Sequence, residues 1–170
     1  GKDPRVDGRC VAIIGGSRGA ELALLLASHY PDIDAVVAIV PGSAVFPALT
    51  DAMTTGGFSL HDKPLPFVPM TWGATPYLLV GDLRGAFETI MQDRAAMQRA
   101  AIAVENINGP IQFVSASRDE MWPSKEMADA MMLRLKAKGF RHPVEHLVVQ
   151  GGHGEPLDEF PKMEAFLDTH

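Results

Sequence analysis

The sequence predicts an α/β fold in which a parallel sheet of about four strands is flanked by helices. Short, almost entirely apolar runs alternate along the chain with longer segments of helical periodicity, as in strand–helix–strand units with right-handed crossovers. The apolar runs carry few polar positions, which is typical of strands buried on both faces of a parallel sheet. The 170 residues amount to about one domain, and a hydrophobic content of 46% is enough for a substantial core.

The first half of the chain contains two of the expected strands. Residues 10–14 form a short apolar run that is expected to be a strand. Its first residue, Cys10, is expected to be a small core residue. Residues 18–29 follow as a helix that Pro31 ends, and residues 35–40 form the second strand. The apolar face of the helix is expected to contain Leu22, Leu25 and Leu26.

Residues 43–106 are expected to form an insert between the second and third strands. Its first part, residues 43–76, is irregular and rich in proline, whereas residues 83–100 have the periodicity of a single helix. A loop of this length inside a compact domain is usually functional or an insertion. We therefore expect the insert to contribute to the functional site.

The second half of the chain completes the sheet. The third strand is predicted at residues 111–115 and the fourth at residues 144–149. Between them, Ser124 is expected to cap a helix that runs to about Lys138 and stops at Gly139. The inward residues of this helix are expected to be Met127, Met131, Met132 and Leu135. A last helix, residues 157–167, is expected to bury Phe160, Met163, Phe166 and Leu167.

Composition excludes several classes of protein. The net charge of -6 disfavours general nucleic-acid binding, which relies on a basic surface. The single cysteine, Cys10, forms no internal disulfide, and no apolar stretch approaches the ~20 residues of a membrane span. We expect one cytoplasmic domain over residues 1–170, with neither a cofactor nor a metal. The chain starts without methionine, so we expect its first residues to be processed, tagged or cut from a longer protein.

The segment Gly15-Gly16-Ser17-Arg18-Gly19 is the most informative motif. A serine in G-x-S-x-G between a strand and a helix is typical of the nucleophile elbow of α/β-hydrolases. Gly15 and Gly19, two residues before and after the serine, allow a tight turn that lifts the Ser17 hydroxyl clear of the backbone. The N–H of Arg18 at the helix start is the expected oxyanion donor. A phosphate-cradling turn is the alternative, but the Lys-Ser/Thr ending of a P-loop is absent.

Two further reactive side chains follow later strands. Because ligands bind at the carboxyl ends of parallel strands, Ser17, Asp119 and His153 are expected to meet there as nucleophile, acid and base. Glu120 and Glu155 remain alternatives for the acid. The other histidines are interpreted as surface or packing residues: His29, His61, His142, His146 and His170.

These segments together resemble the C-terminal catalytic domain of the acyl-CoA thioesterase / bile acid-CoA:amino acid N-acyltransferase family. The resemblance covers nearly the whole chain and is weakest between residues 43 and 106. The more specific segments are Ser117-Arg118-Asp119-Glu120-Met121-Trp122-Pro123-Ser124 and the helix end at Gly139-Phe140. The others are Asp3–Val6, Gly15–Leu24, Ala35–Ile39, Asn108–Ile111 and Gly152-His153.

The resemblance implies a Ser17–His153–Asp119 triad that acts on acyl-CoA or another acyl ester. The bile-acid-conjugating members carry cysteine as nucleophile, so serine at position 17 implies hydrolysis rather than transfer to an amine. The insert would line the acyl channel, with Phe46, Phe58, Phe67 and Trp72 as its apolar candidates. Trp122, near the acid, would either wall the pocket or pack in the core. Two alternatives stay open: a module that binds or assembles without turnover, and a carboxylesterase, dienelactone-hydrolase-like or peptidase-like enzyme.

The chain begins about one strand before the elbow, whereas complete α/β-hydrolases place several strands there. The missing part normally supplies a strand beside residues 11–15 and the second oxyanion N–H. Residues 11–15 are therefore expected to form an exposed apolar edge, which invites pairing with another chain. We expect the chain to be an excised or truncated catalytic domain, or to form a homodimer through this edge.

Overall fold

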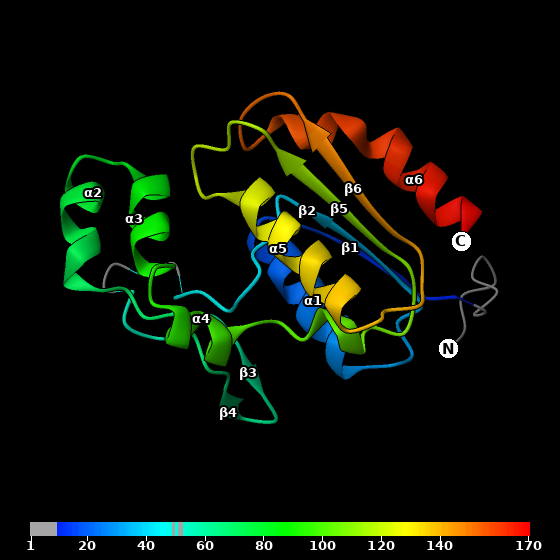
Figure 1. The fold of residues 1–170 in the computed structure, drawn as a ribbon, viewed down its shortest axis with the longest axis horizontal. Coiled ribbons are helices and arrows are strands. Elements are labelled where there is room, and N and C mark those ends of the chain that lie inside the picture. The colour runs from blue at the N-terminus through cyan, green and yellow to red at the C-terminus, as the bar shows by residue number, and fades with distance from the viewer. Residues whose placement is uncertain (1–9, 49, 51–52) are drawn as a thin grey trace.

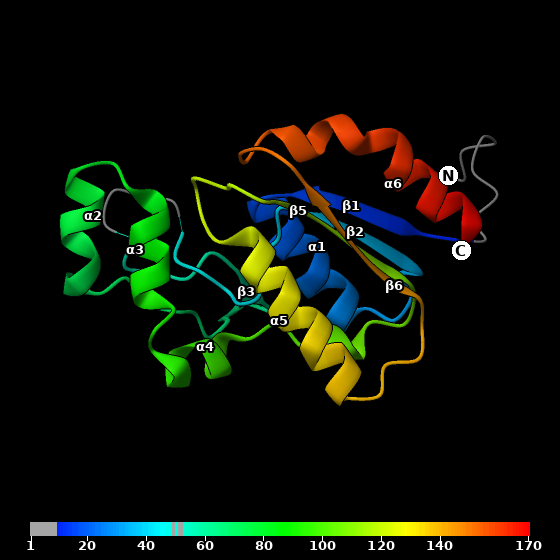
Figure 2. The same cartoon turned by 45° about the horizontal axis from the view of Figure 1, so that its top comes forward.

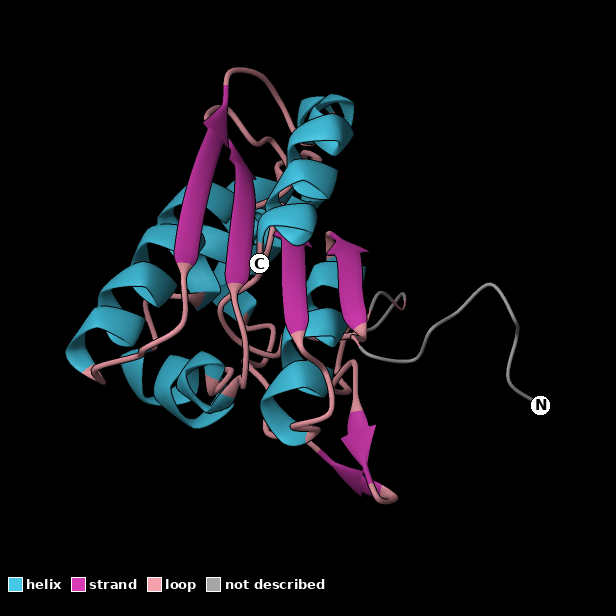
Figure 3. Ribbon diagram, turned by 90° about the vertical axis from the view of Figure 1, so that its right-hand side faces the viewer, coloured by secondary structure: helices cyan, strands magenta, loops and turns pink. Residues whose placement is uncertain are grey.

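Four parallel strands form the central sheet in the order β1-β2-β5-β6 (Figure 1). They are β1 (Ala12–Gly16), β2 (Ala35–Ile39), β5 (Ile111–Ala116) and β6 (Val144–Val149). The structure is a computed structural model that describes residues 10–48, 50 and 53–170, so the segment Asp3–Val6 lies outside the described residues. Figure 3 shows the strands side by side with their carboxyl ends on one edge. The predicted fold class is confirmed.

Helices cover both faces of this sheet (Figure 2). Helices α1 (Arg18–His29) and α5 (Ser124–Ala137) lie on one face, and α6 (Phe160–Thr169) lies on the other, after the short η3 (Glu155–Glu159). All five residues of β2 are buried, because successive side chains point to opposite faces and both faces are covered. Val36 and Ala38 pack with α1 and α5, whereas Val37 and Ile39 pack with α6.

The insert is folded rather than irregular. It contains a small hairpin, β3 (Ser59–Leu60) and β4 (Lys63–Pro64), followed by η1 (Trp72–Ala74), α2 (Thr75–Leu79), α3 (Leu83–Ile90), α4 (Arg94–Ala100) and η2 (Val104–Asn106). Helices α2 and α3 project beyond the sheet (Figure 1). The single helix predicted over residues 83–100 is wrong. Asp93 interrupts it by accepting a hydrogen bond from the N–H of Ala96 at 2.9 Å, which caps α4.

Several predicted side-chain positions are also wrong. Cys10 is exposed rather than buried, because it lies two residues before β1 begins. Leu22 is 40% exposed, and Leu24 takes the buried position on α1. Ser124 does not cap α5, since its Oγ accepts from the N–H of Ala116 at 3.4 Å instead. Phe160 is 45% exposed at the start of α6.

The end of α5 follows the prediction. Gly139 has a φ of 67°, a left-handed conformation that glycine adopts without steric cost. The N–H of Phe140 then bonds to the carbonyl of Leu135 at 3.0 Å, which closes the helix end. Met127, Met131 and Leu135 are buried in the core.

β1 forms one edge of the sheet. Among the described residues it pairs only with β2, and Val11 and Ile14 are 54% and 38% exposed. Within the same part of the chain, no helix combines the length and the apolar character needed to cross a bilayer.

Candidate active site

Ser17 lies at the turn between β1 and α1 in a conformation that few non-glycine residues adopt. Its φ is 54° and its ψ is −120°, and its N–H bonds to the carbonyl of Ile39 at 2.8 Å. A Cβ at Gly15 would overlap the backbone of Gly19, so this position has no room for a side chain. Gly19 itself has open space around its Cα, and the steric requirement for glycine therefore applies to Gly15 alone.

The structure brings Ser17, His153 and Asp119 into one hydrogen-bonded chain. His153 Nε2 lies 2.9 Å from Ser17 Oγ, and His153 Nδ1 lies 2.8 Å from Asp119 Oδ1. The three residues follow β1, β6 and β5 at the carboxyl edge of the sheet. A histidine with one nitrogen on a serine hydroxyl and the other on a carboxylate has the arrangement of a general base for nucleophilic attack.

The Asp119 carboxylate is fully buried. Its Oδ1 also accepts the N–H groups of Met121 at 3.0 Å and Trp122 at 3.3 Å. Burial alone would raise the pKa of Asp119, but the His153 imidazole and the Ser124 hydroxyl outweigh this effect and hold the pKa below its usual range. Asp119 is thus ionised beside His153, as stabilisation of a charged imidazole requires.

Glu120 contacts the backbone of the histidine loop rather than the imidazole. Its Oε2 accepts the N–H of His153 at 2.9 Å. Next to this contact, the N–H of Arg118 bonds to the carbonyl of Gly151 at 2.9 Å. The acid loop and the histidine loop are therefore joined through their backbones, and Asp119 is the acid that contacts the ring.

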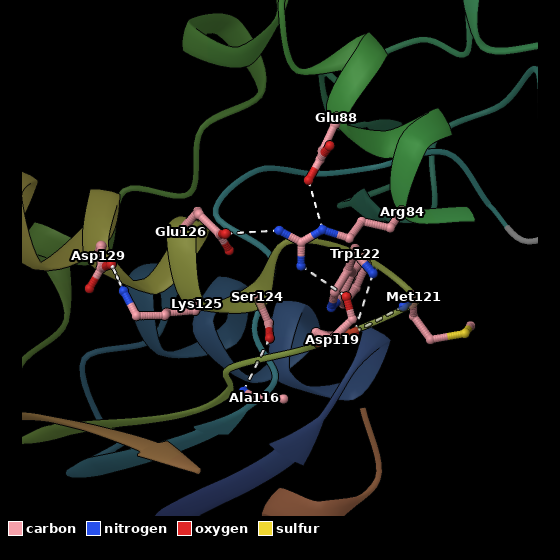
Figure 4. Close-up of polar contacts among 10 residues, drawn as sticks. All are labelled: Arg84, Glu88, Ala116, Asp119, Met121, Trp122, Ser124, Lys125, Glu126 and Asp129. Atoms are coloured by element: carbon pink, nitrogen blue, oxygen red, sulfur yellow. Dashed lines mark hydrogen bonds and ion pairs between the residues drawn. The ribbon is translucent and has the colours of Figure 1, made fainter. Parts of the chain in front are cut away.

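Arg84 connects the insert to the acid loop (Figure 4). From the start of α3 its guanidinium donates to the carbonyl of Asp119 at 2.9 Å, to Glu126 of α5 at 2.8 Å and to Glu88 of its own helix at 2.7 Å. This one side chain ties α3 and α5 to the loop that carries the acid.

Trp122 is buried behind the site. Its indole N–H donates to the carbonyl of Val40 at 3.1 Å, and its ring centroid lies 6.1 Å from that of His153. Val40 has a φ of 43°, which is rare for a β-branched residue and signals backbone strain at the end of β2. The indole hydrogen bond helps to hold this strained turn.

Three of the five residues predicted to line the substrate channel lie in different environments. Trp122 is only 3% exposed and packs against Phe46 and Phe87, so it has little surface to offer a substrate. Phe67 is partly buried against the main core. Trp72 is 91% exposed and borders an open cavity of about 310 Å³ in the insert. The other residues that line it are Thr54, Met70, Thr71, Thr75 and Leu78.

Arg18 is the first residue of α1, so its N–H has no partner within the helix and lies beside Ser17. This is the position required of an oxyanion donor. In the part of the chain that the structure describes, no three His, Cys, Asp or Glu side chains lie close enough together to hold a metal ion.

Sequence reasoning missed the contacts of Arg84 and the buried pair that Glu21 forms with Arg18. The contact of Arg84 with the acid loop spans 35 positions and has no local signal. Glu21, in contrast, is an acid among apolar residues three positions after Arg18, a spacing that permits a pair on one helix face.

A family model described as BAAT / Acyl-CoA thioester hydrolase C terminal matches residues 1–168. Acyl-coenzyme A thioesterase 1 of Mus musculus is 26% identical over 162 residues, which cover 95% of this chain and 36% of that relative. The mitochondrial acyl-coenzyme A thioesterase 2 of Homo sapiens is 27% identical over 166 residues, covering 96% of this chain and 32% of the relative. The chain thus spans about a third of the length of these relatives.

Solved structures share the fold at low sequence identity. The acylaminoacyl peptidase of Pyrococcus horikoshii is 13% identical with a TM-score of 0.57, and the match covers 98% of this chain and 24% of that one. Acetyl xylan esterase 1 from Thermoanaerobacterium sp. is 16% identical with a TM-score of 0.51, covering 96% and 46%. These similarities show that the sheet and its helices belong to the α/β-hydrolase fold.

Proposed function

The chain belongs to the BAAT/acyl-CoA thioester hydrolase C-terminal family. On this basis, we propose that it is a serine hydrolase that acts on acyl-CoA thioesters. The observation that carries this proposal is the hydrogen-bonded chain from Ser17 through His153 to Asp119. The related acyl-coenzyme A thioesterases support the choice of substrate class.

The proposed reaction has two halves. Ser17 Oγ attacks the thioester carbonyl while His153 Nε2 accepts its proton, and Asp119 stabilises the resulting imidazolium. The Arg18 N–H donates to the oxyanion. The C–S bond then breaks, and His153 returns the proton to the departing thiolate. In the second half, His153 takes a proton from water, the hydroxide attacks the acyl-Ser17 ester, and Ser17 leaves with that proton to release the carboxylic acid.

Serine at the nucleophile position favours water as the acceptor. A cysteine nucleophile gives a thioester intermediate, which amines attack readily, whereas Ser17 gives an oxyester. We therefore propose hydrolysis rather than transfer of the acyl group to an amine. The exposed Trp72 and the adjoining cavity are the proposed contact of the insert with the acyl chain.

A fluorophosphonate probe tests the nucleophile, because it phosphonylates an activated serine. We expect labelling of the intact protein and its loss in Ser17→Ala. Release of free thiol from acyl-CoA then tests the substrate class, with p-nitrophenyl esters and peptides as the comparison. Faster turnover of esters or peptides would replace the thioesterase proposal by a carboxylesterase, dienelactone-hydrolase-like or peptidase-like one.

The position of β1 at the edge of the sheet, as far as the described residues show it, favours a second candidate function, a module that binds or dimerises without turnover. Exposed Val11 and Ile14 on an edge strand offer a surface for pairing with a second copy. Sedimentation of the protein at several concentrations tests the dimer, and a monomer throughout would contradict it. Absence of probe labelling in a folded protein would favour the binding module over the enzyme. The cytoplasmic location stays a prediction.

A further inference from the structure

A buried carboxylate lies one helical turn beyond the candidate nucleophile. Glu21 of α1 is 0% exposed, although its neighbours in the core are apolar. Its side chain binds Arg18 on the same helix and accepts the N–H of Phe46 at 3.1 Å. Burial raises the pKa of Glu21, while Arg18 and the Phe46 N–H act in the opposite direction. Such a group is costly to bury unless it is paired.

The Arg18 side chain extends from the elbow to the insert. Its guanidinium donates to the carbonyl of Phe46 at 3.2 Å and lies 5.3 Å from the centre of the Phe58 ring. The backbone at Gly57 packs so closely that a Cβ there would overlap the guanidinium. Arg18 is therefore held on several sides, by Glu21 on its own helix and by residues of the insert.

We propose that the Arg18–Glu21 pair is a positioning device that fixes the oxyanion donor relative to the insert. The inference rests on the proposed function, because it assigns the pair to that site. The donor N–H and the clamped guanidinium belong to the same residue, so a shift of the side chain is transmitted to the backbone at the start of α1. Phe46 adds the second link, since both its N–H and its carbonyl bind the pair.

The position of the donor matters because it must meet the charge that develops only in the transition state. A displacement of about 1 Å can cost on the order of 100-fold in rate. Loss of the pair is therefore expected to lower kcat/KM by about 10- to 100-fold, chiefly through kcat. A purely structural pair would change the folded fraction and leave the kinetics of the folded molecules unaltered.

Three variants test the device in the full chain. Glu21→Gln keeps the shape of the side chain and an acceptor for Phe46, but it turns an amide toward Arg18. Arg18→Met removes the guanidinium, and Arg18→Lys keeps the charge. Glu159→Gln is the matched control, because Glu159 and Lys162 also form a pair three residues apart but lie on the other face of the sheet.

The decisive readout compares turnover with binding of an acyl trifluoromethyl ketone, which forms an oxyanion on the reactive serine. We expect kcat/KM and the affinity for the ketone to fall together in Glu21→Gln and Arg18→Met, with partial rescue in Arg18→Lys and no change in Glu159→Gln. KM should change less than kcat. Should Arg18→Met fail to fold, the near-isosteric Glu21→Gln carries the test alone.

Two results would overturn the inference: unchanged kcat/KM per folded molecule in Glu21→Gln, or a fall in kcat/KM without a matching loss of ketone affinity. Failure of the proposed function gives a different pattern. In that case the intact protein is not labelled by the fluorophosphonate and does not bind the ketone, whatever residue stands at position 21.

Discussion

Exchange of Asp119 for asparagine is the sharpest test of the acid, because it changes the charge and leaves the shape. In the native protein Asp119 Oδ1 accepts three hydrogen bonds, from His153 Nδ1 at 2.8 Å and from two backbone N–H groups at 3.0 and 3.3 Å. An asparagine oxygen in the place of Oδ1 can keep all three bonds, and the amide nitrogen then takes the place of Oδ2, which is buried without a hydrogen-bond partner among the described residues of the native protein. Because asparagine is neutral, it no longer stabilises the imidazolium that forms when His153 Nε2 accepts the proton of Ser17.

The expected cost is about 10⁴-fold in kcat, or on the order of 5 kcal/mol of transition-state stabilisation. The assay is steady-state hydrolysis of an acyl-CoA by Asp119→Asn, together with the rate of fluorophosphonate labelling. The matched control is Glu120→Gln, since Glu120 accepts the backbone N–H of His153 at 2.9 Å and an amide oxygen can replace it. We expect the control to lose about tenfold or less, because that hydrogen bond can be kept.

The reasoning would be refuted if Asp119→Asn kept more than about a tenth of the activity while folded. A deeper loss in Glu120→Gln than in Asp119→Asn would also refute it, and would move the role of the acid to Glu120. Thermal unfolding of both variants provides the control for folding.

Three further expectations concern stability and can be measured by urea unfolding followed by circular dichroism. Trp122→Phe removes the indole bond to the buried Val40 carbonyl and should cost about 1–3 kcal/mol; no loss would mean that this bond does not hold the strained turn. Leu24→Ala opens a cavity at a fully buried site and should cost about 2–5 kcal/mol, whereas a loss below that range would show that the core collapses around it. Burial lowers the pKa of His146 below its usual 6.5, so the unfolded state binds more protons than the folded state as pH falls below 6.5. The free energy of unfolding should therefore decrease as the pH is lowered below 6.5, and it should decrease less steeply in His146→Gln. Equal pH dependence in the variant and the native protein would contradict this.

Much of the fold could be predicted because the central strands are short and mostly apolar. Residues 35–40 have no polar position and nearly coincide with β2, and residues 144–149 coincide with β6 although they include Glu145 and His146. The boundary between α3 and α4 was missed because apolar periodicity continues through residues 83–100, while a single cap at Asp93 decides the break. Cys10 was misplaced because the predicted strand begins at residue 10, whereas β1 begins at Ala12 and leaves Cys10 outside the sheet.

The residues of the candidate site were visible because parallel strands bring their carboxyl ends to one edge. Ser17, Asp119 and His153 each follow a predicted strand, and topology alone places them near one another. The contacts that orient them could not be predicted in the same way. Arg84 reaches Asp119, and Trp122 reaches Val40, across 35 and 82 positions, and such pairs depend on how the insert packs against the sheet.

A second set of side chains shows that hydrogen bonding alone does not define the site. Ser115 Oγ lies 2.7 Å from His146 Nε2, and His146 Nδ1 lies 3.2 Å from Asp129 Oδ1, which repeats the order serine, histidine, acid. Ser115, however, is fully buried within β5, between two paired strands. Because Ser115 has no exposed surface, its hydroxyl is not open to a carbonyl substrate. Ser17 differs in its left-handed backbone, its partial exposure and its position at the start of α1. The case for catalysis at Ser17 therefore depends on the elbow as much as on its contact with His153.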